Sequence, residues 1–141
     1  MEDYILREIN KIGQLIEAIL QKLGVMKGAT QEEKLYAAAK EELLEKLKMN
    51  VEELPEGDEI VPYLRQKYEF TNADLEKFAE LLFTLVPPAP DPDTRMRLVA
   101  RIIGIYRYLE VHESSFSSHR YHILKELQHS PAYTPLPHEP V

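Results

Sequence analysis

The hydrophobic residues of this chain recur at helical spacing along most of its length. In the first segment, aliphatic side chains follow one another at intervals of 4, 3, 4, 3 and 4 residues: Ile5, Ile9, Ile12, Ile16, Ile19 and Leu23. That alternation is the a/d pattern of a heptad repeat, in which one apolar stripe runs along a helix. Asp3 is well placed to cap this helix and Gly24 to end it. The pattern predicts a helix of about twenty residues, roughly 30 Å long at 1.5 Å per residue.

This first helix has two alternative uses, and the stripe fits both of them. The helix either lies along the core of one bundle or pairs with its copy in a second chain. Leu15 and Leu20 widen the stripe beyond a narrow two-stranded seam. If the helix pairs, we expect the self-association surface to consist of five isoleucines: Ile5, Ile9, Ile12, Ile16 and Ile19.

Five further helices are predicted from apolar stripes and from residues that favour helix ends. They cover approximately residues 30–47, 58–68, 71–85, 91–109 and 117–128. Capping-box patterns mark the starts at Thr30 and Thr71, each followed three residues later by an acidic side chain. Asp91 before Pro92 marks another start, because proline is favoured at the first helical position.

No segment alternates as a strand does, so the predicted fold class is all-α, an antiparallel helical bundle of five to six helices. Ile103-Gly104 with Tyr106 and Tyr108 resembles the first helix of a tetratricopeptide repeat, which implies helical-hairpin packing. The chain lacks the repeat's period of about 34 residues. We expect one domain over residues 1–129 and a proline-rich, extended or disordered tail over residues 130–141.

Two stretches together resemble a known family. The opening Asp3-Tyr-Ile-Leu-Arg-Glu-Ile9 is similar to the Asp-Tyr-Ile-x-Arg-x-Ile start of a family of small bacterial all-helical proteins of uncharacterised function. The late residues Tyr108-Leu109, Phe116-Ser117 and Arg120 are similar to the same family's Tyr-Leu and Phe-Ser-x-x-Arg segment. The resemblance implies a helical fold and a bacterial source, and it brings no activity or catalytic residue with it.

The segment His112–His122, HESSFSSHRYH, is the one cluster of residues with candidate chemistry. His119 and His122 are three residues apart on a helix and could chelate one metal ion, with His112 or Glu113 as the third ligand. This set gives the alternative hypothesis of a metal-dependent hydrolase. The other interpretation is a corner between two helices, in which serines cap and Phe116 packs between the helices. His112 then continues the stripe of the preceding helix and faces inward.

Composition narrows the classes of function. The 141-residue chain has a net charge of −7 and no cysteine, so disulfides, thiolate catalysis and cysteine-bound zinc are excluded. The chain lacks the dense basic run of a nucleic-acid binder. Charged residues interrupt its N-terminal segment, whereas a signal peptide or a membrane span has a continuous apolar stretch. We therefore expect a cytoplasmic protein that is not an enzyme and needs no cofactor.

The predicted function is protein–protein interaction, either self-association through the first helix or binding of another protein. A third hypothesis is a groove for an extended peptide, which the proline-rich tail of a neighbouring chain could occupy.

Overall fold

A computed structural model of the chain describes residues 2–28, 31–113 and 117–128, with side chains from residue 11 onward. This part of the chain forms α-helices and two short 3₁₀ turns and contains no strand, which confirms the predicted all-α bundle. The α-helices are α1 Glu2–Met26, α2 Glu32–Leu47, α3 Ile60–Tyr68, α4 Asn72–Leu85, α5 Pro92–His112 and α6 Ser118–Leu127. The turns are η1 Val51–Glu53 and η2 Gly57–Glu59. The predicted tail over 130–141 lies outside the described residues.

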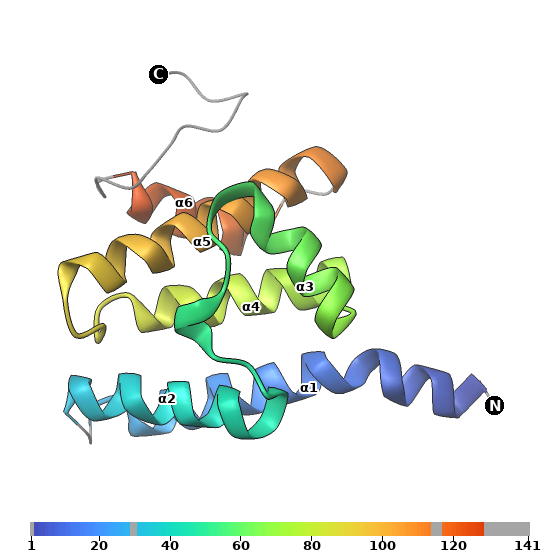
Figure 1. Cartoon of the computed structure of the whole chain (residues 1–141), viewed down its shortest axis with the longest axis horizontal. Coiled ribbons are helices and arrows are strands. Elements are labelled where there is room, and N and C mark those ends of the chain that lie inside the picture. The colour runs from blue at the N-terminus through green and yellow to red at the C-terminus, as the bar shows by residue number, and fades with distance from the viewer. Residues whose placement is uncertain (1, 29–30, 114–116, 129–141) are drawn as a thin grey trace.

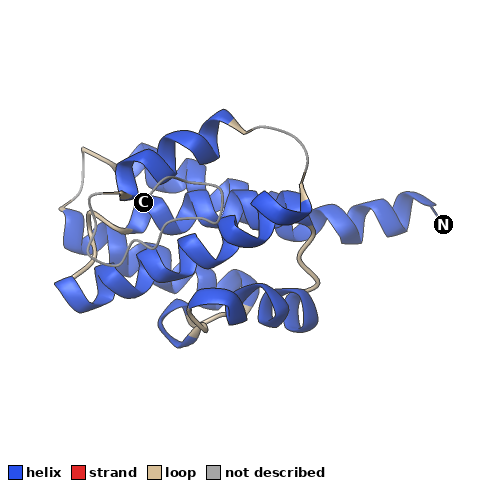
Figure 2. Ribbon diagram, turned by 90° about the horizontal axis from the view of Figure 1, so that it is seen from above, coloured by secondary structure: helices blue, strands red, loops and turns tan. Residues whose placement is uncertain are grey.

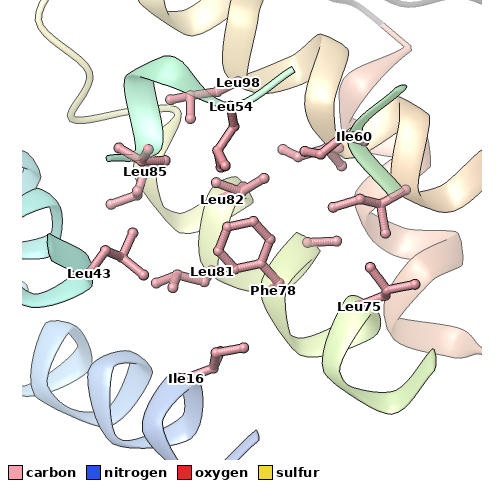
Figure 3. Close-up of a cluster of buried hydrophobic side chains, with 14 of the residues drawn as sticks. Ile16, Leu43, Leu54, Ile60, Leu75, Phe78, Leu81, Leu82, Leu85 and Leu98 are labelled. Atoms are coloured by element: carbon pink, nitrogen blue, oxygen red, sulfur yellow. The ribbon is translucent and has the colours of Figure 1, made fainter. Parts of the chain in front are cut away.

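Helix α4 occupies the middle of the bundle. Figure 1 shows α1 and α2 side by side below it and α5 above it, with α6 next to α5 and α3 at one end. The apolar side chains of α4 therefore pack on both sides. In Figure 3, Leu81 points toward Ile16 of α1 and Leu43 of α2, whereas Leu82 points toward Leu54 and Leu98. One continuous core joins the two layers.

The predicted caps of three helices are confirmed. Thr71 and Asp74 form a reciprocal capping box: the Thr71 hydroxyl accepts from Asp74 N, and the Asp74 carboxylate accepts from Thr71 N. The side chain of Asp91 accepts from Thr94 N ahead of Pro92. Ser117 accepts from the backbone of α6, so one serine of the histidine-rich segment is a cap, as predicted.

Two predicted helix ends are wrong. The N-cap of α2 is Gln31 and not Thr30, and the Gln31 side chain makes no capping bond. Thr30 itself lies outside the described residues. At the other end of the turn, α1 continues through Gly24 to Met26. Gly24 lies inside the helix and needs no left-handed backbone; the positive φ that favours glycine, of 88°, belongs to Gly28, two residues beyond the helix.

The connection between α2 and α3 crosses the bundle, as Figure 1 shows in green, and α5 holds it in place. The buried guanidinium of Arg101 donates from Nε and Nη2 to the carbonyl of Leu54 at 3.1 and 2.9 Å, and from Nη2 to that of Glu52 at 3.1 Å. Burial lowers the pKa of Arg101. Three hydrogen bonds that hold this connection thus come from the side chain of one residue, which is 47 or more residues away in sequence.

Candidate functional site

The histidine-rich segment does not form one cluster. His112 is exposed at the end of α5, and its Nδ1 donates to the carbonyl oxygen of Tyr108 at 2.9 Å. Its ring stacks on that of Tyr108, with centroids 4.1 Å apart. The prediction that His112 faces inward is therefore wrong. The apolar stripe ends at Leu109, and the imidazole finds a carbonyl partner and a ring at the surface one turn back.

The other two histidines of the segment, His119 and His122, are exposed on α6. His119 Nδ1 is 3.9 Å from Glu80 Oε1 of α4, and the ring of His122 contacts that of Tyr121 edge-on at 5.8 Å. Among the residues that the structure describes, no group of three or more histidine, aspartate or glutamate side chains is arranged to hold a metal ion. The metal-dependent hydrolase hypothesis relies on His112, Glu113, His119 and His122. In the described part of the chain, these residues do not form a metal-binding group.

Arg120, which the sequence did not single out for chemistry, is the buried polar group of this corner. Its side chain is 3% exposed, with Nη1 3.2 Å from Glu76 Oε1 of α4 and Nε 3.2 Å from Glu110 Oε1 of α5. Burial raises the pKa of Glu76, while the guanidinium acts to lower it. Burial also raises the pKa of Tyr106 beside them. The arrangement neutralises one buried cation with two carboxylates and anchors α6 to both neighbouring helices.

A shallow depression lies between the end of α3, the start of α4 and the C-terminal part of α5. It has a volume of about 610 Å³ and is open to solvent. Its lining is polar: Arg65 Nη1 donates to Asn72 Oδ1 at 3.2 Å, and its guanidinium lies 5.8 Å from the ring centre of Tyr108. Glu69 also lines the depression, and its negative charge is opposite in sign to that of Arg65. The depression offers no enclosed apolar surface for a ligand.

Helix α1 divides into two parts with different surroundings. From Ile12 onward its stripe belongs to the core, and Ile16 and Ile19 are 0% and 2% exposed within a single chain. These two isoleucines cannot contact a second copy, so two of the five residues predicted for the interface are corrected to core. Figures 1 and 2 show the first turns of α1 extending beyond all the other helices. We refer to residues 2–10 as the arm; the side chains of Ile5 and Ile9 lie outside the described residues.

Gly13 of α1 lies against the first turn of α4. A Cβ at this glycine would lie 2.9 Å from Asp74 Oδ1, so the Asp74 side chain packs directly against the backbone of α1 here. Asp74 is in the first turn of α4, which begins at Asn72. The arm therefore projects from the point at which α4 starts.

An apolar hollow lies at the opposite end of α1. We refer to it as the α1–α4 hollow; its volume is about 460 Å³, within the range of roughly 300–1,000 Å³ typical of ligand sites. It opens between the turn that joins α1 to α2 and the C-terminal end of α4. Its lining is Lys27, Gly28, Glu32, Leu35, Phe83, Thr84, Pro87 and Pro88. Sequence patterns gave no sign of it, because it forms where three separate segments meet.

Comparison with known protein families, with curated proteins and with solved structures gives no match. The resemblances to a small helical family and to tetratricopeptide packing therefore stay predictions. In the described part of the chain, no helix is long and apolar enough to cross a membrane.

Proposed function

We propose that this protein is a self-association module, in which the arm of one copy reaches onto a second copy. The observation that carries the proposal is the projection of α1: its first turns extend past the other helices while the rest of the helix is fixed in the core. The arm thus presents helical backbone away from its own chain.

The sequence of the arm supports the same function. Ile5 and Ile9 continue the heptad register of Ile12 and Ile16 into a part of α1 that has left the body of the bundle. An isolated helix shorter than roughly 12–15 residues is marginal in water. A projecting helical segment with an apolar stripe is stabilised by covering that stripe, at about 25 cal/mol per Å² of apolar surface removed from water.

The test is the mass of the protein in solution. Sedimentation velocity across about 1–100 µM covers the range of weak to moderate association. We expect concentration-dependent self-association of the natural sequence. The double substitution Ile5→Asp, Ile9→Asp should give a folded monomer, because the arm lies outside the core, and its melting temperature should match that of the natural sequence at concentrations where the natural sequence is dissociated.

The matched control replaces two exposed apolar residues elsewhere. Met96 and Val111 are 44% and 69% exposed, and Met96→Asp with Val111→Asp should leave the association unchanged. A natural sequence that stays monomeric throughout the range would refute the proposal. So would an arm variant that unfolds, because the arm would then be core.

A further inference from the structure

We infer that the arm of one copy docks in the α1–α4 hollow of a second copy. The inference rests on the proposed self-association and assigns the surface that receives the arm. The occupant is residues 2–10 of another chain, bound as an amphipathic helix in an apolar groove.

The lining of the hollow fits an isoleucine stripe. Leu35 and Pro88 of the lining are buried, and Phe83 is half-buried. The Thr84 hydroxyl already donates to the carbonyl of Glu80 at 3.0 Å, so the threonine brings no unmet hydrogen-bond donor to the lining. The hollow thus offers apolar surface to the apolar positions Ile5 and Ile9.

Charge distinguishes this docking from the pairing of two arms. At 100° per residue, Glu2 and Glu8 occupy positions on either side of the isoleucine stripe, while Arg7 falls on the opposite side of the helix. Two arms laid stripe to stripe would place glutamates beside glutamates and no cation between them. The lining of the hollow includes one cation, Lys27, and one carboxylate, Glu32, and no carboxylate lies within ion-pair distance of that lysine among the described residues.

The positions of the two surfaces set the form of the assembly. The arm is at the N-terminal end of α1 and Lys27 follows its C-terminal end, so about 37 Å of helix separates the ends of α1. The contact joins two different surfaces. Two copies lying side by side in opposite directions satisfy both contacts at once and form a closed dimer.

Complementation between two defective variants tests the inference. Variant one is Ile5→Asp, Ile9→Asp, which retains an intact hollow. Variant two is Thr84→Glu, which places a carboxylate in the apolar lining and retains an intact arm. Thr84→Val, of the same shape, is the matched control for variant two. Circular dichroism melting of each variant verifies that it is folded.

We expect each variant alone to associate at least ~100-fold more weakly than the natural sequence, as for loss of a central contact. An equimolar mixture, with one variant fluorescently labelled, should form a 1:1 complex, because one arm and one hollow remain intact. Thr84→Val should associate as the natural sequence does.

Other outcomes overturn the inference and separate its failure from that of the proposed function. If the Thr84→Glu variant associates as the natural sequence does and forms no complex with the arm variant in the mixture, the arms pair with each other. Self-association then stands, and the hollow is not the surface that receives the arm. If Tyr133→Ala, Leu136→Ala in the full chain abolishes association while the arm variant does not, the tail is the occupant. A monomeric natural sequence removes both proposals.

Discussion

At the scale of single residues, Gly104 is the glycine of the described chain where an added Cβ would meet the closest contact. A Cβ there would lie 2.0 Å from the carbonyl oxygen of Gly57 and 3.1 Å from Ile60 Cγ2. Because the nearer atom is backbone, Gly104→Ala has to displace the turn at η2, and we expect a loss of about 3 kcal/mol in the free energy of unfolding by urea. Gly24→Ala is the control: its Cβ meets nothing within 4 Å, and the helix should gain up to about 1 kcal/mol. Equal effects of the two substitutions would contradict this packing.

Arg120 gives a residue-scale prediction that depends on pH. Arg120→Met leaves the glutamates at 76 and 110 without their shared cation, and we expect a loss of about 3 kcal/mol at pH 7. Burial already raises the pKa of Glu76, and removing the guanidinium raises it further. A carboxyl whose pKa is raised by folding favours the folded state at low pH and loses that contribution as pH rises through the folded pKa.

The deficit of the Arg120→Met variant should therefore shrink as the pH is lowered from 7 toward about 5, which urea unfolding at several pH values would measure. Arg97→Met is the matched control. Arg97 pairs with Asp93 one turn away at an exposed site, so its loss should cost under about 1 kcal/mol at every pH. A deficit that is constant across this range would show that Glu76 does not carry the effect.

At the scale of elements, the start of α4 depends on its capping box. Thr71→Ala removes the acceptor of Asp74 N and should lower the free energy of unfolding by about 1 kcal/mol. Gln31→Ala is the matched control at the start of α2, because the Gln31 side chain makes no capping bond and its loss should change stability little. Chemical denaturation of both variants measures the difference, and a similar loss in both would argue against a specific role for the box.

The elements also show which features a sequence can predict. Stripes such as that of α1 and caps such as Thr71 and Asp91 are local signals, since a helix and its first turn involve residues only three or four apart. The burial of Arg101 and Arg120 had no such signal, because their partners belong to other elements of the bundle. His112 was misplaced for the same reason: periodicity gives the direction of a side chain but not where its neighbouring helix ends.

At the scale of the whole molecule, α1 connects the core, the arm and the α1–α4 hollow. Its middle is core, its first turns project, and its far end borders the apolar hollow. The stripe alone left two uses of the helix open, and the structure divides them along its length. Residues from 12 onward serve the fold, and the proposed contacts between chains fall to the arm.

Self-association should depend on the charges of the arm and of the hollow together, because the proposed contact brings the two surfaces of different copies together. Lys27→Glu on the rim of the hollow should weaken self-association by about 10-fold, because it places like charge opposite Glu2 and Glu8 of the arriving arm. Glu2→Lys with Glu8→Lys should weaken it similarly, and the three substitutions together should restore affinity by re-forming opposite charges with reversed sign. Sedimentation at low and high salt measures both effects, since added salt screens exposed pairs. Strictly additive losses would mean that these charges never meet, whereas recovery in the triple variant requires that the arm of one copy lies against the hollow of another.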